Sequence, residues 1–193
     1  MKLLLHSCCG PCSLGTIFQL KNDFELTGFF FNPNIAPKEE FFRRIDSFNK
    51  SFEHYDLPCI VDSDYTKHKK WRNSVKGLEF LKENSERCLK CYEFRLRETA
   101  ILAKKMGFEY FATTLTVGPT KKAEIINRIG KKLENEYNVR FIEGNFKKNN
   151  GWNESIRLSK ELNLFRQHYC GCEFSLREML LRKYQKNSKQ DDS

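Results

Sequence analysis

The sequence predicts an α/β fold, in which a single domain is built on a parallel sheet with helices on both faces. Short apolar segments typical of buried strands alternate along the chain with longer segments of helical periodicity. Parallel neighbouring strands need crossover connections, and helices usually supply them. No repeat or low-complexity linker divides the 193 residues, and a chain of this length can fold without disulfide bonds. We expect one domain over residues 1–185, ending in a helical C-terminal extension, and a polar, disordered tail over 186–193.

The first half of the chain alternates between the two kinds of segment. A short apolar strand over 2–5 ends at a group of cysteines, and residues 13–21 have apolar residues at helical spacing. A second strand is expected over 24–31. Asn-Pro-Asn then breaks the chain before a long helix, which we expect over 37–54. A third strand follows over 57–61.

The second half continues this alternation after a polar, basic stretch over 64–85, in which we expect short helices. A long helical pattern ends at Gly107, a residue that commonly terminates helices. The remaining elements follow from apolar runs and helical spacing. We expect helices over 86–106, 119–136, 153–162 and 173–184, and strands over 110–115 and 139–143.

The charge of the chain favours a polyanionic partner. Lys and Arg total 34 against 25 acidic residues, which gives a net charge of +9. Nucleic acid is the obvious candidate, although a solvated lysine-rich surface would give the same balance. No stretch resembles an export signal or approaches the roughly 20 apolar residues of a membrane span. We therefore expect a cytoplasmic protein that does not contact membranes.

Seven of the eight cysteines fall into three tight groups. Cys59 stands alone in a strand pattern, where a free cysteine usually packs as a small core residue. Cysteines that are not needed for folding, yet cluster in this way, favour redox or metal chemistry. The groups are Cys8, Cys9 and Cys12; Cys88 and Cys91; and Cys170 and Cys172.

The first two groups can form one metal site. Cys88 and Cys91 lie three residues apart at the start of a predicted helix, so their sulfurs share one face. That helix start can abut the edge where the first strand ends and its cysteine loop begins. Four such thiolates suit zinc or an iron-sulfur cluster, and their spacing does not separate the two. The third group favours an electron-transfer site.

Three other functions fit parts of the pattern. Cys9-Gly10-Pro11-Cys12 has the spacing of a thiol-disulfide oxidoreductase, but Cys8 precedes it directly. An ATP-dependent tRNA sulfur transferase of similar fold would use cysteines and a basic surface, although the first strand lacks a glycine-rich phosphate loop after it. A zinc-stabilised RNA-binding module would be colourless and would hold one zinc per chain. Iron content therefore separates these alternatives.

Four motifs together resemble the cobalamin-independent epoxyqueuosine reductases, the QueH family. They are HSCCGPC at 6–12, CLKCY at 88–92, TTLTVGP at 113–119 and YCGCEFS at 169–175. The resemblance runs in order from Leu3 to about Arg182. It implies an α/β fold of the HUP type, similar to Rossmann folds. It also implies two-electron removal of the epoxide oxygen of epoxyqueuosine at the tRNA wobble position, the last step of queuosine biosynthesis, with an electron donor that the sequence does not identify.

The resemblance also implies roles for the cysteines. Cys8, Cys9, Cys88 and Cys91 correspond to the ligands of a [4Fe-4S] cluster, and Cys170 and Cys172 correspond to a redox-active pair. Members of the family are thought to hold a second iron close to the cluster. Many of them carry Asp where this chain has Cys12. We expect Cys12 to face the same cavity and to bind or approach that second metal as a softer ligand.

Other residues are candidates for proton transfer and for tRNA binding. Tyr92 and His6 lie beside cysteine ligands and could donate protons, or could simply pack there. Phe41, Phe42 and Trp71 could stack on anticodon bases or belong to the core. A basic set on the helix expected after TTLTVGP could contact phosphates. This set is Lys121, Lys122, Arg128, Lys131 and Lys132.

Overall fold

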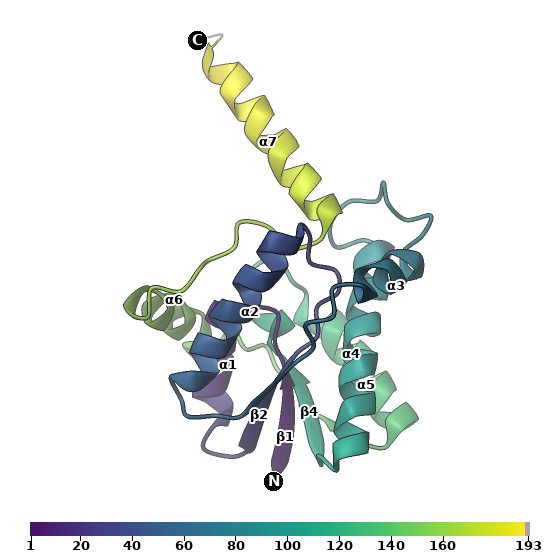
Figure 1. Cartoon of the computed structure of the whole chain (residues 1–193), viewed down its shortest axis with the longest axis vertical. Helices are drawn as coiled ribbons and strands as arrows, with labels where there is room; N and C mark the ends of the chain where they lie inside the picture. The colour runs from purple at the N-terminus through teal and green to yellow at the C-terminus, as the bar shows by residue number, and fades with distance from the viewer. Residues whose placement is uncertain (192–193) are drawn as a thin grey trace.

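The computed structural model describes the backbone of residues 1–191 and the side chains of residues 1–188, and it confirms the predicted α/β class (Figure 1). One five-stranded sheet has the strand order β3-β2-β1-β4-β5, and every neighbouring pair is parallel. The expected disorder at 192–193 lies outside the described residues. The strands are β1 (Lys2–His6), β2 (Glu25–Phe30), β3 (Cys59–Val61), β4 (Tyr110–Thr113) and β5 (Arg140–Phe141).

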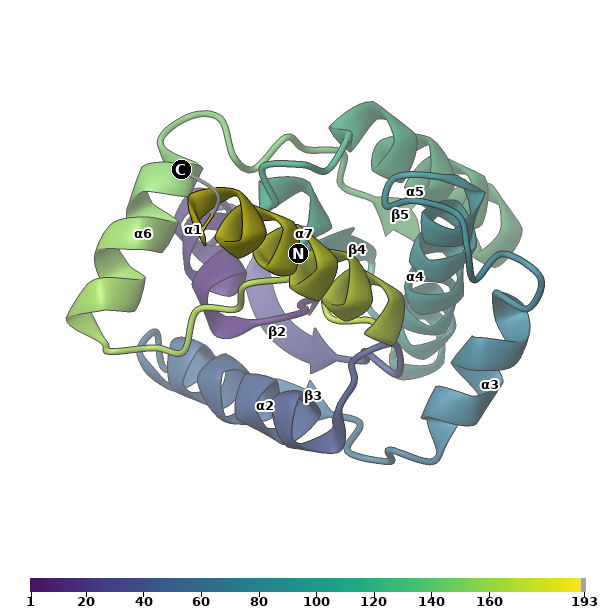
Figure 2. The ribbon, with the colours of Figure 1, turned by 90° about the horizontal axis from the view of Figure 1, so that it is seen from above.

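Helices cover both faces of this sheet. Helices α1, α2 and α6 pack together on one face, while α4 and α5 pack on the other with α3 beside α4, as Figure 2 shows from above. None of the described helices is long and apolar enough to cross a bilayer. The helices are α1 (Gly10–Leu20), α2 (Lys38–Glu53), α3 (Lys67–Ser74), α4 (Glu86–Met106), α5 (Ala123–Tyr137), α6 (Gly151–Glu161) and α7 (Glu173–Asp191), with a short 3-10 helix, η1 (Thr114–Val117).

The central strand β1 is buried on both faces. Leu3 and Leu5 belong to the core under α1 and α2, whereas Leu4 between them belongs to the core under α4. This alternation is the two-residue period of a strand. Such a strand is a nearly continuous apolar run, as is typical of a parallel sheet covered on both sides. The register places His6 beside Phe29 of β2 and Thr113 of β4.

Several predicted boundaries need correction. Helix α1 begins at Gly10, three residues before the expected start, because Pro11 fits the first turn of a helix; Cys12 therefore lies on the helix. Strand β4 ends at Thr113, and the chain continues as η1 and a turn. Helix α5 starts only at Ala123, so Lys121 and Lys122 precede it.

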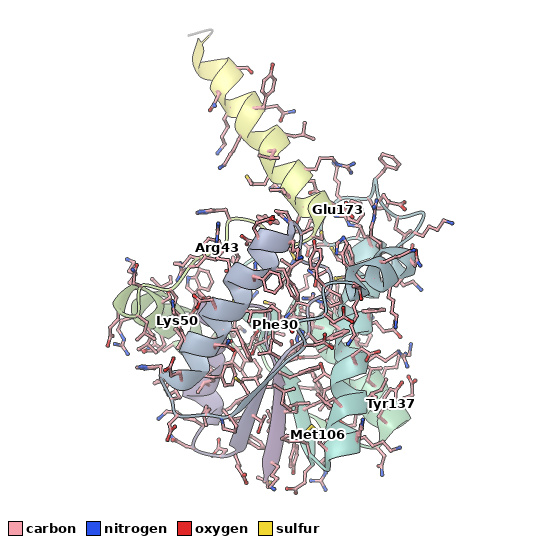
Figure 3. The ribbon with its side chains drawn as sticks, viewed as in Figure 1. Phe30, Arg43, Lys50, Met106, Tyr137 and Glu173 are labelled. Atoms are coloured by element: carbon pink, nitrogen blue, oxygen red, sulfur yellow. The ribbon has the colours of Figure 1, made fainter. Side chains whose placement is uncertain are left out.

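Two further predictions were wrong. Cys59 is exposed rather than buried, because β3 is a short strand at the edge of the sheet. Helix α7 continues to Asp191 instead of ending near Tyr184. Figure 3 shows Glu173 at the base of this projecting helix, while Met106 lies at the opposite end of the molecule.

Candidate active site

A cavity of about 1030 Å³ lies at the edge where the strands end. The loop after β1 contributes Cys8, and the first turn of α1 contributes Cys12. Residues 114–121 after β4, residues 167–170 and one side of α7 complete the walls. In the observed strand order the chain passes from β1 to β2 on one side and later to β4 on the other. Ligands of open parallel sheets usually bind at such a switch point.

The three N-terminal cysteines form a compact sulfur group. The sulfurs of Cys8, Cys9 and Cys12 all lie within 4.8 Å of one another. Hydrogen bonds from Cys12 and Cys9 hold the pKa of Cys8 well below its usual range. The hydrogen bonds to Cys8 and Cys9, together with burial, raise the pKa of Cys12. A deprotonated sulfur beside two further thiols can hold a metal, because the thiolate is the form that ligates.

Gly10 lets these cysteines sit against α2. A Cβ atom at Gly10 would lie 2.1 Å from the carbonyl oxygen of Ser47. Only glycine permits this close approach of two backbones. The side-chain amide of Gln167 donates a hydrogen bond of 3.0 Å to the Cys9 sulfur, which links the group to the segment before α7.

Cys88 and Cys91 lie in the first turns of α4, and each is only 7% exposed. They have different neighbours. Cys88 lies in the core region against which Cys8 also packs, and its sulfur accepts a hydrogen bond from the Asn84 amide at 3.3 Å. Cys91 packs with Trp71, Cys172 and Phe174, and burial raises its pKa to about 11. Cys88 therefore lies in the same core region as Cys8, whereas Cys91 packs in the region of Cys172.

Cys170 and Cys172 lie at the base of α7 as free thiols. Gly171 between them has a φ of 131°, a value that side chains other than glycine rarely tolerate. Arg44 of α2 donates hydrogen bonds of 3.1 and 3.0 Å to the carbonyls of Tyr169 and Cys170. This turn is therefore fixed to the body of the protein. Cys172 is buried against Ser175, whereas Cys170 lines the cavity.

Arg95 places a buried positive charge among the sulfurs. It is 1% exposed and lines the cavity. Its Nη1 donates to the Asn32 side chain at 3.2 Å, while its Nη2 has no partner among the described residues. Burial opposes its charge, yet the nearby sulfurs of Cys91, Cys170 and Cys8 raise its pKa. A guanidinium in this position can compensate the negative charge of several thiolates.

Lys121 is placed differently from the other predicted phosphate contacts. Its side chain is 8% exposed, and its ammonium lies 3.1 Å from the Cys170 sulfur and 2.7 Å from Glu83. Burial works against its charge, but Cys170, Tyr92 and Glu83 raise its pKa. This contact with a sulfur does not suit a role on an outer phosphate-binding face.

The other basic residues of the set lie at or near the surface. Lys131 pairs with Glu134 and Lys132 pairs with Glu93, which partly neutralises them. Lys122 and Arg128 are exposed. Phosphate contact stays a prediction for these four residues.

The two predicted proton donors are both buried. The ring nitrogens of His6 lie 2.9 Å from Thr113 Oγ1 and 3.2 Å from the carbonyl of Phe31, and burial lowers its pKa to about 4. His6 therefore joins the strand ends rather than supplying protons. The Tyr92 hydroxyl has no partner among the described residues, and its ring lies under the Lys121 ammonium at 5.6 Å. Its catalytic role stays a prediction.

The three aromatic residues predicted to stack on anticodon bases differ in exposure. Phe41 and Trp71 are each 1% exposed and belong to the core, while Phe42 is 44% exposed. Gln167, Glu83 and Arg44 also contact the site, and no local pattern in the sequence assigned them a role. Arg44 shares the buried face of α2 with Phe41 and Phe48, and a charged residue at helical spacing among such aromatic residues is a signal that could have been noticed.

Comparisons with known proteins give the same family that the four sequence motifs resemble. The family model described as epoxyqueuosine reductase QueH matches residues 3–178. A Thermotoga maritima protein named epoxyqueuosine reductase QueH is 43% identical over 91% of each chain. A Staphylococcus epidermidis protein of the same name is 38% identical over 90% of this chain and 76% of its own length.

Two solved structures share the fold. The U34-tRNA thiolase NcsA from Methanococcus maripaludis, solved with its [4Fe-4S] cluster, has a TM-score of 0.58 at 18% identity, covering 90% of this chain and 61% of that one. A predicted tRNA methyltransferase subunit from Methanocaldococcus jannaschii has a TM-score of 0.51 at 14% identity, covering 82% and 75%. At these identities the likeness concerns the fold alone. The family match over nearly the whole chain and the two relatives of the same name establish that the chain belongs to the epoxyqueuosine reductase QueH family.

Proposed function

We propose that this chain reduces epoxyqueuosine to queuosine at the wobble position of tRNA in the cytoplasm. The observation that carries the proposal is the cavity at the switch point, where Cys8, Cys12 and Cys170 from distant segments face one space. Its volume of about 1030 Å³ suits a modified nucleoside, because small-molecule sites usually measure several hundred to about 1,000 Å³.

The donor set fits an iron-sulfur cluster. We infer that Cys8, Cys9, Cys88 and Cys91 would hold a [4Fe-4S] cluster, with Arg95 offsetting its charge. The Cys91 side chain packs beside Cys172 in this structure and would have to turn toward Cys88 to complete the set. The close grouping of Cys8, Cys9 and Cys12 within 4.8 Å supports a metal at this end of the cavity, and it leaves Cys12 available for a second iron. When bound, the cluster supplies single electrons, which no ordinary side chain can do.

Cys170 and Cys172 would supply the electron pair. Opening the epoxide and forming the alkene consumes two electrons and two protons, and the oxygen leaves as water. Oxidation of the dithiol to a disulfide releases the same two electrons and two protons. An external thiol or reduced protein, which remains unidentified, would then return the pair to the dithiol. Cys170 is half-buried and lines the cavity, whereas Cys172 is buried, as expected for an attacking and a resolving thiol.

The test starts from protein purified without oxygen. Iron and sulfide are measured, and tRNA carrying epoxyqueuosine is incubated with the protein and dithionite before its nucleosides are analysed by mass spectrometry. We expect about four irons per chain from the proposed cluster, about five where Cys12 also holds the second iron, and conversion to queuosine. The variant Cys88→Ala/Cys91→Ala should lose iron. The variant Cys170→Ser/Cys172→Ser should keep its iron and lose multiple turnover.

The results of these measurements separate the alternative functions and ligand assignments. Full iron in the Cys88 and Cys91 variant would show that the ligand assignment is wrong. Loss of iron in the Cys170 and Cys172 variant would make that pair ligands rather than a redox relay. Zinc instead of iron, without conversion, would favour the RNA-binding module. ATP-dependent sulfur incorporation into tRNA would favour the sulfur transferase.

A further inference from the structure

Helix α7 presents two chemically different faces. One face, which we call the cavity face, lines the cavity above the cysteines. The other, which we call the outer face, lines a separate groove. The spacing of three and four residues within each set is that of one side of a helix. The cavity face includes Ser175, Met179, Arg182, Lys183 and Lys186. The outer face includes Leu176, Arg177, Leu180 and Leu181.

Only the base of α7 is fixed to the body. Phe174 is 5% exposed against Trp71, and Arg87 of α4 bonds Glu178 at 3.2 Å. Above this base, α7 projects away from the rest of the described chain, as Figure 1 shows. Tyr184 is accordingly 74% exposed. This part of the helix therefore offers a surface that the described part of the chain does not cover.

The charge of the cavity face is one-sided. Arg182, Lys183 and Lys186 line the cavity, and α7 contributes no acidic residue to its wall within residues 173–188. Among the side chains that the structure describes, Lys183 and Lys186 have no carboxylate within 4.0 Å. Arg182 shares Glu178 with Arg87, at a longer distance of 3.8 Å. A basic wall continuous with a cavity that ends in thiols fits an anionic substrate whose reactive part enters the cavity.

We propose that the cavity face of α7 binds the phosphates of the anticodon loop on either side of the wobble nucleotide, while the modified base enters the cavity toward Cys170. Arg182 and Lys186 lie about 6 Å apart along the helix axis, so they can contact successive phosphates. Tyr184 lines the mouth of the cavity and can stack on a neighbouring base, as aromatic residues do in single-stranded RNA recognition. This inference rests on the proposed tRNA substrate.

The test compares variants that lose the same charge. Lys183→Ala/Lys186→Ala removes two cations from the cavity face. Lys104→Ala/Lys105→Ala removes two exposed cations from the far end of α4. Lys131→Ala/Lys132→Ala removes two from α5, the competing phosphate-binding face. Each iron-loaded protein is assayed for tRNA affinity at several salt concentrations and for the kcat and KM of epoxyqueuosine reduction.

We expect the α7 variant to bind tRNA at least about tenfold more weakly, with KM raised in parallel. The slope of log affinity against log salt concentration should be less steep by about 1.4 in this variant, because it loses two contacts and each contact with a single-stranded phosphate contributes about 0.7 to the slope. Iron content and kcat should stay at the wild-type values. The α4 variant should bind within about twofold of wild type, since distant exposed charges are screened.

Three outcomes would overturn the inference. One is wild-type tRNA affinity in the α7 variant. Another is an equal loss of affinity in the α7 and α4 variants, which would leave only a general effect of net charge. A third is a dimer in sedimentation that Leu180→Ser/Leu181→Ser dissociates, with tRNA binding unchanged in the α7 variant, which would assign the helix to a second copy. A wild-type protein that binds tRNA yet does not reduce it would instead count against the proposed function.

Discussion

Replacing Lys121 by methionine removes the cation that contacts Cys170 while keeping a long apolar side chain. The ammonium lies 3.1 Å from the sulfur and 2.7 Å from Glu83. At the 3.1 Å separation from the sulfur, Coulomb's law gives two opposite unit charges an attraction of about 1.3 kcal/mol in water and about 5 kcal/mol at an effective dielectric constant of about 20. The net value of a hydrogen bond to a charged group usually lies between these limits, at about 1.5 to 3 kcal/mol.

An ammonium in contact with a cysteine sulfur makes that sulfur more reactive toward electrophiles. Because 1.4 kcal/mol corresponds to a factor of ten, the loss of Lys121 should slow the reaction of Cys170 with iodoacetamide by about 10- to 150-fold. The assay uses prereduced, iron-loaded protein at neutral pH, with limiting reagent and peptide mapping by mass spectrometry. Cys172 lies against Ser175 rather than Lys121, so its rate should change little.

Two matched variants sharpen this measurement. Lys122→Met makes the same substitution at the next, exposed position and should leave the Cys170 rate unchanged. Glu83→Gln removes the anion that shares the ammonium, so Cys170 should react at least as fast as in the wild type. An unchanged Cys170 rate in Lys121→Met, or an equal fall in Lys122→Met, would refute the reasoning.

Two further predictions concern stability and the isolated cysteine. In Gly28→Ala the new Cβ would lie 2.5 Å from a ring carbon of Phe52 and 2.9 Å from one of Phe48. This overpacking should cost about 1 to 3 kcal/mol, and thermal unfolding followed by circular dichroism should show a melting temperature lowered by about 2 to 12 °C; an unchanged melting temperature would mean that α2 shifts freely. Cys59→Ser should keep wild-type stability and iron content because Cys59 is exposed, and a loss of iron on this change would mean that Cys59 takes part in the metal site.

Family membership and the grouping of the thiols could be predicted before the structure was known, but the arrangement within the site could not. Cys88 and Cys91 were predicted to share one helix face, and they do lie in the first turns of α4. Their division between the first and third cysteine groups depends on where α3 and α7 pack. The three sulfurs within 4.8 Å likewise depend on α1 beginning at Gly10.

The sequence alone determined the order in which strands and helices follow one another along the chain, and the bounds of α4. Hydrophobic periodicity and helix-ending glycines act over a few residues, so they can be recognised locally. Tertiary structure decided that Lys121 would face Cys170 across 49 positions of sequence, and that Arg95 would lie buried among sulfurs from three segments. It also decided that Cys59 would lie exposed at a sheet edge and that α7 would project from the body. These outcomes depend on which distant segments pack together, and burial and charge pairing follow from that packing rather than from local pattern.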